Sequence, residues 1–273
     1  MTRPAPGERR LSFGHVAELY DRVRPGYPAE LVEHVLAFSG AEPGDRALEV
    51  GAGTGKATAL FAERGLEIVA LEPSAEMAEV AVRNCARYPS VTVERREFER
   101  WRPDPRSFRL LLSAQAWHWI SPELRYVLAG QALEPGGTLA VFWNRPSWES
   151  SPLRDELAEA YRRAAPDLGA GAGPGPMYPA ADSRTSWWGD WSSEIAAAPE
   201  FGSAESRVYR WHERHPTARY LELLSTHSDH IVLGDARLRD LLDAVGEVLE
   251  RHGGVLDLEY ETSLWMATAT GES

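Results

Sequence analysis

Cysteine is almost absent from this chain of 273 residues, because Cys85 is the only one. A single thiol excludes an internal disulfide and any cysteine cluster that would bind zinc or an iron–sulfur centre. Lysine is equally scarce, since Lys56 is the sole lysine and all other basic residues are arginines. Long apolar runs are also missing, so no segment is long enough to cross a bilayer, and residues 1–6 lack the apolar core of a signal peptide. We therefore expect a cytoplasmic protein.

The charge balance excludes another class of partner. The chain has 29 basic and 41 acidic side chains, a formal net charge of -12, so a nucleic-acid backbone would meet an adverse field. The length suits one large α/β domain with insertions or two small domains, and we favour the first. We expect a small-molecule partner, no nucleic acid, no membrane, no metal, and a monomer or homodimer.

Short apolar runs alternate with helical segments over the first half of the chain. The runs with the length and apolar content of buried strands are 46–50, 67–71, 91–96, 108–114 and 138–143. Strands that alternate with helices predict a parallel sheet with a ligand site at its carboxyl edge. In residues 13–38, helical spacing on both sides of Arg24-Pro25 predicts a helix, a bend and a second helix.

The composition changes after Asn144. Residues 153–165 are predicted to form an amphipathic helix, and residues 169–176 are a glycine- and proline-rich link. The tryptophans predicted to lie in or near a cap are Trp143, Trp148, Trp187, Trp188 and Trp191. The remaining predicted elements, which complete the same sheet, are strands at 206–215 and 255–269 and helices at 218–224 and 236–252.

Residues 48–56, Leu-Glu-Val-Gly-Ala-Gly-Thr-Gly-Lys, are the most informative stretch. A strand, a glycine turn and a helix N-terminus together let backbone amides approach a ligand closely. A dinucleotide fingerprint would need glycine at Lys56, and a Walker A loop would need glycine at Val50 and serine or threonine at Ala57. The spacing therefore disfavours both and leaves Glu-x-Gly-x-Gly-x-Gly.

This pattern resembles motif I of class I S-adenosylmethionine-dependent methyltransferases. The resemblance implies cofactor contacts from Glu49, Gly51, Ala52, Gly53 and Gly55. Glu72, Pro73 and Met77 resemble the family's ribose site, where an acid takes both ribose hydroxyls in charge-assisted hydrogen bonds. Glu97 and Phe98 match its adenine-binding position. The order of these pieces implies S-adenosylmethionine as the cofactor.

The resemblance also implies a fold class, α/β with a Rossmann-like, seven-stranded, mostly parallel sheet, an N-terminal helical lid and a helical cap insertion. The expected segments are the lid at 1–40, the cofactor-binding core at 41–145, the cap insertion at 146–205, and strands and helices at 206–273 that complete the sheet. The implied activity is methyl transfer to an oxygen, nitrogen or carbon atom of a small molecule, in specialised metabolism. An NAD(P)-dependent oxidoreductase and a non-catalytic cofactor-binding module on the same fold remain alternatives.

Two segments, 13–28 and 112–120, resemble a subgroup of small-molecule methyltransferases related to trans-aconitate methyltransferase. The trans-aconitate enzymes carry glutamine where this chain has His118, so the resemblance does not extend to their acid substrate. The segment after the fourth strand lies at the carboxyl edge of the sheet, where it can line cofactor and acceptor pockets. Predicted there are cofactor contacts from Ser113, Ala114 and Gln115 and acceptor contacts from Trp117, Trp119, Asn144 and Arg145.

His118 is the predicted catalytic base, because a reference pKa near 6.5 would let it take a proton from a hydroxyl or an amine. The alternative is a structural role, in which His118 only orients its loop while Trp117 and Trp119 pack. Tyr20 and Arg24 present a similar choice. In one interpretation Tyr20 contacts the methionine end of the cofactor and Arg24 pairs with the cofactor carboxylate or with an anionic substrate. In the other, Tyr20 is a core residue and Arg24 is a surface arginine.

Two histidine pairs, at 212–215 and 227–230, do not predict a metal site. The first is one residue short of the helical zinc-protease motif and falls in a predicted strand, and the second lacks a third clear ligand.

Overall fold

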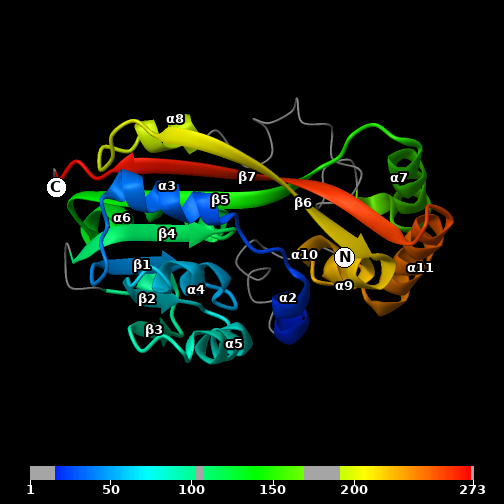
Figure 1. Cartoon of the computed structure of the whole chain (residues 1–273), viewed down its shortest axis with the longest axis horizontal. Helices are drawn as coiled ribbons and strands as arrows, with labels where there is room; N and C mark the ends of the chain where they lie inside the picture. The colour runs from blue at the N-terminus through cyan, green and yellow to red at the C-terminus, as the bar shows by residue number, and fades with distance from the viewer. Residues whose placement is uncertain (1–15, 103–106, 169–190, 272–273) are drawn as a thin grey trace.

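The computed structural model describes residues 16–102, 107–168 and 191–271, and every structural statement below concerns these residues. One seven-stranded sheet runs through the molecule in the order β3-β2-β1-β4-β5-β7-β6 (Figure 1). Its strands are β1 Arg46–Val50, β2 Glu67–Leu71, β3 Val91–Glu94, β4 Phe108–Ala114, β5 Leu133–Ser147, β6 Glu205–Pro216 and β7 Val255–Thr268. The first five pair in parallel, whereas β7 is antiparallel to β5 and β6. The predicted fold class is confirmed.

Helices cover both faces and one end of this sheet (Figure 1). The α-helices are α2 Ala17–Val23, α3 Ala29–Ser39, α4 Lys56–Ala62, α5 Ala75–Cys85, α6 Arg125–Ala132, α7 Pro152–Ala164, α8 Trp191–Ala196, α9 Thr217–Ser225, α10 Ser228–Ile231 and α11 Asp235–Arg251. Three short 3₁₀ helices are η2 Phe98–Arg100, η3 Trp117–Trp119 and η4 Pro166–Leu168.

The alternation of side chains along β4 shows how the two faces are filled. Leu110 and Leu112 belong to the same buried cluster as Val32 of α3 and Phe61 of α4. Leu111, which points the other way, belongs to a cluster that includes residues of α6 and α8. Apolar residues on both faces are typical of a strand buried inside a parallel sheet.

A third buried cluster lies beyond the parallel strands. It combines α7, α9 and α11 with the first half of β7, where Leu256, Leu258 and Tyr260 are its members. The second half of β7 contributes Leu264 and Met266 to the cluster under α3 and α4. The long strand β7 therefore joins the sheet to the C-terminal helices (Figure 1).

Some boundaries differ from those expected. β3 ends at Glu94, because the amide of Arg96 bonds back to the Glu94 carbonyl at 2.9 Å and turns the chain out of the sheet. β5 continues to Ser147, because its last residues pair with β7 as far as Glu259. α10 was not expected, since its four residues are too few to show an apolar period.

The predicted lid at 1–40 contains two different structures. α3 packs on the sheet through Leu31, Val32 and Val35, whereas α2 lies against α5 and α9. The predicted link at 169–176, and Trp187 and Trp188, lie outside the described residues. Within the described ranges, no helix combines the length and apolar content that crossing a membrane demands.

Candidate functional site

A glycine turn joins β1 to α4 at the carboxyl edge of the sheet. Gly51 has φ +73°, and a Cβ there would lie 2.3 Å from the Cβ of Ala116, so conformation and space both require glycine. The amides of Gly51 and Ala52 donate to the carbonyl of Leu71 at 2.9 and 3.0 Å. These bonds fasten the turn to the end of β2.

Glu72, buried just beyond β2, holds the middle of the turn. Its Oε2 accepts from the amide of Gly53 and its Oε1 from the amide of Ser74, both at 2.8 Å. Gly53 has φ +57° and open space where a Cβ would stand. A ligand can therefore approach its backbone closely.

Glu49 is completely buried one residue before the end of β1. Its Oε2 accepts a 2.5 Å hydrogen bond from Thr58 Oγ1, while its buried Oε1 has no hydrogen-bond partner among the described residues. Burial raises the pKa of this carboxyl to about 8, against the opposing effect of the Thr58 hydroxyl, and nearby Glu72 raises it further. Glu49 is therefore mostly protonated at neutral pH and one of its oxygens lacks a partner.

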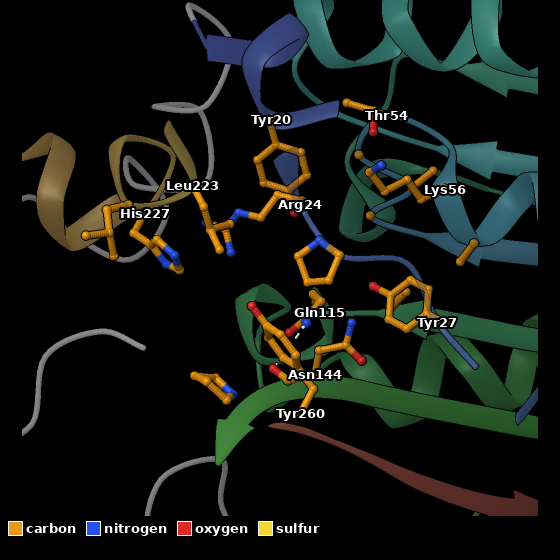
Figure 2. A pocket seen from close by; sticks show the side chains of 18 of the residues that line it. Tyr20, Arg24, Tyr27, Thr54, Lys56, Gln115, Asn144, Leu223, His227 and Tyr260 are labelled. Atoms are coloured by element: carbon orange, nitrogen blue, oxygen red, sulfur yellow. Dashed lines mark hydrogen bonds between the residues drawn. The ribbon is translucent and has the colours of Figure 1, made fainter. Parts of the chain in front are cut away.

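A cavity of about 760 Å³, counted with its open mouth, begins at this turn and extends to the C-terminal helices (Figure 2). Its sheet-side lining is Glu49, Gly51, Ala52, Gly53, Thr54, Lys56, Ala57, Ala114, Gln115, Asn144 and Pro146. The N-terminal segment adds Tyr20, Arg24, Pro25 and Tyr27. The C-terminal part adds Tyr220, Leu223, Leu224, His227, Leu258 and Tyr260. We call the sheet-side wall at residues 49–57 the turn end and the wall from the C-terminal part the helical end.

α2 covers the cavity and is anchored at both ends of it. Arg24, which directly follows α2, donates from Nε to Thr226 Oγ1 and from Nη2 to the Thr226 carbonyl, both at 2.8 Å. Since Thr226 caps the C-terminus of α9, the guanidinium also meets the negative end of that helix. On the other side, Asp21 accepts from Asn84 Nδ2 at 2.9 Å and lies 3.9 Å from Lys56 Nζ.

Gln115, directly after β4, and Asn144, within the neighbouring parallel strand β5, form the floor of the cavity. Gln115 has φ +62°, a conformation that residues other than glycine rarely adopt, and its Nε2 donates to the Asn144 carbonyl at 3.3 Å. The Asn144 side chain donates to the Gly26 carbonyl at 2.7 Å and accepts from Thr262 Oγ1 at 2.7 Å. Asn144 thus ties the segment after α2 to β7.

Comparison with known proteins agrees with this geometry. Residues 47–137 match the family model described as a methyltransferase domain. An uncharacterised methyltransferase of Mycobacterium tuberculosis is 38% identical over 161 residues, which span 54% of this chain and 63% of that protein. A probable S-adenosylmethionine-dependent methyltransferase of Saccharomyces cerevisiae is 31% identical over 137 residues, or 45% of this chain and 43% of that protein.

Residues 47–137 therefore form a methyltransferase domain of the class I, S-adenosylmethionine-dependent kind. The chain spans less than two thirds of the length of these curated relatives. Solved structures share its fold. One, from Anaeromyxobacter dehalogenans and titled as a type II methyltransferase, has a TM-score of 0.61 at 20% identity and covers 90% of this chain and 97% of its own. Another is a Haemonchus contortus phosphoethanolamine N-methyltransferase in complex with S-adenosyl-L-methionine. It has a TM-score of 0.53 at 17% identity and covers 94% of this chain and 57% of its own.

The turn end of this domain fits the amino-acid part of S-adenosylmethionine. S-adenosylmethionine carries an ammonium and a carboxylate on its methionine moiety. Glu49, whose Oε1 lacks a partner, lines the cavity, where an ammonium would supply the missing donor and favour the ionised carboxylate. Arg24 and Lys56 line the same cavity and supply positive charge for a carboxylate.

The predicted site residues divide into two groups. Those that line the cavity are Tyr20, Arg24, Glu49, Gly51, Ala52, Gly53, Ala114, Gln115 and Asn144. Those that are absent from its described lining are Gly55, Glu72, Pro73, Met77, Glu97, Phe98, Ser113, Trp117, His118, Trp119 and Arg145. In the second group Ser113 is buried and donates to the Val50 carbonyl at 2.8 Å, which ties β4 to β1. The nucleoside contacts of Glu72, Glu97 and Phe98 remain predictions.

The structure puts His118 in a packed environment rather than on the cavity wall. Its Nδ1 accepts from Trp143 Nε1 at 3.2 Å, and its ring lies against Trp119 with centroids 4.6 Å apart. Burial, with Arg125 adding to the effect, lowers its pKa to about 4. This placement favours the structural role of His118 that the sequence left open.

Several cavity residues were missed by sequence reasoning: Tyr27, Thr54, Lys56, Tyr220, Leu223, His227 and Tyr260. Lys56 could have been found, because it is the sole lysine and lies beside the turn. His227 was considered only as a metal ligand. Over the described residues, no group of three or more histidine, cysteine or acidic side chains is arranged to hold a metal ion.

Proposed function

We propose that this protein transfers the methyl group of S-adenosylmethionine to an oxygen, nitrogen or carbon atom of a small molecule. The observation that carries the proposal is the single cavity that connects the turn end, with its protonated Glu49, to a helical end built by other elements. A donor and an acceptor held in one such space need little more than alignment to react. When bound, S-adenosylmethionine supplies an electrophilic methyl group on a sulfonium.

The roles proposed for the chain are mainly in binding. Glu49 and the backbone of Gly51 and Gly53 hold the methionine part, and Glu72 holds the ribose. Arg24 has a positioning role, because its two bonds to Thr226 keep α2 over the cavity. Exclusion of water by α2 strengthens the electrostatic contacts beneath it.

The acceptor is proposed to be small because the cavity is bounded by α2, β7 and α9 rather than open as a groove. The net charge of -12 also disfavours a nucleic-acid substrate. Specialised metabolism, a cytoplasmic location and a monomeric or homodimeric state belong to the same proposal.

Calorimetry with S-adenosylhomocysteine tests the function. The parent protein is expected to bind it, and Glu72→Ala to bind at least tenfold more weakly, because a ribose bonded to a carboxylate loses charge-assisted bonds. Glu79→Ala is the matched control, since Glu79 is an exposed acid on the next helix, α5. Thermal melting of each variant checks that it is folded.

Two results would overturn the proposal. One is binding of NAD(P) without binding of S-adenosylhomocysteine, which would favour the oxidoreductase. The other is a folded Glu72→Ala protein that binds the cofactor product as tightly as the parent. Binding without release of methylated product over a broad acceptor screen would favour the non-catalytic module.

A further inference from the structure

The helical end of the cavity has a different chemistry from the turn end. Its walls come from α9 and from the first half of β7, and most of them are apolar or aromatic: Tyr220, Leu223, Leu224, Leu258 and Tyr260. These residues also belong to the buried cluster that holds the C-terminal helices together. The walls are therefore packed from behind and form a preformed apolar chamber.

His227 interrupts this apolar wall. It caps the N-terminus of α10, is only 6% exposed and lines the cavity. Its ring makes no hydrogen bond to any described residue. Figure 2 shows it on the side of the cavity opposite Tyr27, with the Arg24 side chain extending toward it. The ring nitrogens are not among the buried side-chain atoms that lack a partner, so they are open to the cavity, where a ligand can supply the hydrogen bond.

The neighbouring histidine, His230, differs from His227 because both of its ring nitrogens are hydrogen-bonded. Its ring lies 5.5 Å from that of His227, centroid to centroid. Yet His230 Nδ1 is bonded to Asp229 Oδ1 at 2.8 Å and Nε2 to the Tyr161 hydroxyl at 2.9 Å. Two buried histidines thus sit side by side, and the one without hydrogen bonds faces the cavity.

The backbone gives His227 a defined position. Its amide donates to the Leu224 carbonyl at 3.1 Å, and its carbonyl accepts from the amides of His230 and Ile231 at 3.0 and 2.9 Å. The bond between His230 Nε2 and the Tyr161 hydroxyl then anchors α10 on α7. The ring of His227 is held at the junction of α9 and α10.

The charges around His227 keep it neutral. Burial lowers its pKa well below 6.5, and the positive charge of Arg24 and the neighbouring His230 add to this effect. The other titratable groups near it are Tyr220 of α9 and Tyr260 of β7, which line the same cavity, and Asp229 of α10 and Tyr161 of α7, which bond to the adjacent His230. A neutral imidazole has one nitrogen that accepts a hydrogen bond.

We propose that the helical end is the acceptor pocket for an uncharged aromatic molecule that carries a hydroxyl group, and that His227 selects this molecule by accepting the hydroxyl's hydrogen bond. Tyr220, Tyr260 and the leucines supply the surface for the aromatic ring. The inference rests on the proposed function, because it assigns the second substrate of the same cavity. An acceptor without the hydroxyl would leave the imidazole buried and unpaired, which is how such sites discriminate strongly.

The test uses 2-naphthol and naphthalene as probes, titrated into the whole protein saturated with S-adenosylhomocysteine. The parent is expected to bind 2-naphthol at least tenfold more tightly than naphthalene. His227→Phe, which keeps a ring but removes the acceptor nitrogen, is expected to reduce this preference to less than threefold. His227→Gln, which offers an acceptor oxygen, is expected to restore part of it.

His212→Phe is the matched control, because His212 is exposed on β6 and is not among the cavity residues. It should keep the parent's preference for 2-naphthol. S-adenosylhomocysteine binding by each variant within twofold of the parent shows that the fold and the turn end are intact.

The results separate this inference from the proposed function. A parent that binds S-adenosylhomocysteine but shows no preference for 2-naphthol overturns the inference alone, and so does a preference that survives in His227→Phe. Tighter binding of naphthalene-2-sulfonate than of 2-naphthol would assign the pocket to an anion and also overturn it. A parent that does not bind S-adenosylhomocysteine overturns the proposed function first.

Discussion

The two ends of the cavity are built in different ways. The turn end comes from one continuous stretch, residues 49–57, whose shape depends on backbone bonds and positive φ angles. The helical end is assembled from α9, α10 and β7, and it is joined to α2 by side chains such as Arg24 and to the sheet floor through Asn144. A local sequence pattern can therefore reveal the first end, whereas the second exists only after distant segments have packed.

Gly51→Ala disrupts the turn end and has the largest expected effect on stability. The new Cβ would meet Ala116 at 2.3 Å in a backbone with φ +73°, so overlap and backbone strain together cost about 3 kcal/mol of unfolding free energy. Urea denaturation measures this cost. Gly136→Ala is the control, because Gly136 has φ +78° and open space, and strain alone costs about 1 kcal/mol there. Equal losses in the two variants would show that the contact with Ala116 is soft.

Glu49→Gln tests whether the Glu49 carboxyl, at the turn end, is protonated in the folded protein. A carboxyl with a native pKa of about 8 binds more protons in the folded than in the unfolded state between about pH 4.5 and 8, so it loses its stabilising effect as pH rises. From pH 5.5 to 7.5 the unfolding free energy of the parent should fall by about 2–3 kcal/mol relative to that of Glu49→Gln. Urea denaturation at three pH values measures the difference in slope. Parallel pH profiles would mean that Glu49 is already ionised.

Arg24→Gln tests the link between α2 and the helical end. Loss of its bonds to Thr226 is expected to lower the unfolding free energy by about 1–2 kcal/mol. The loss is smaller than for a fully buried charged hydrogen bond, because Arg24 is only partly buried. Arg22→Gln is the control on the same two helices, since the pair between Arg22 and Glu222 is exposed and should change stability by less than about 0.5 kcal/mol. Similar small losses in both variants would show that Arg24 does not anchor α2.

His118→Gln has the smallest expected effect. A native pKa of about 4 lies below the unfolded value near 6.5, so the unfolded state binds the extra proton and the parent loses stability as pH falls between these values. From pH 6.5 to 5.5 the unfolding free energy of the parent should fall by about 1 kcal/mol more than that of His118→Gln. Chemical denaturation at the two pH values measures this difference. Glutamine still offers an acceptor to Trp143, and the exposed His212→Gln should follow the parent. An unchanged slope in His118→Gln would contradict the neutral state of the partly buried His118.

The sequence predicted most of the sheet, because its strands are short apolar runs that alternate with helical segments. It also located the turn end, since Gly51, Gly53 and Glu72 keep a spacing that only a strand–helix–strand unit explains. The predicted segment at 117–119 shows where such reasoning stops. Its position after β4 suggested a substrate contact, but burial against Trp143 and Arg125 depends on residues that no local pattern brings to it.

The sequence by itself indicated the methyltransferase domain, the alternation of strands and helices and the backbone of the turn, because these depend on residues close together in the chain. Only the tertiary structure decided which side chains enclose the rest of the cavity. His227 lies about 170 residues beyond the turn, and it reaches the same cavity because β7 runs from the sheet to the C-terminal helices and α2 holds α9 beside it. Contacts between segments so far apart arise from packing, and no spacing along the chain records them.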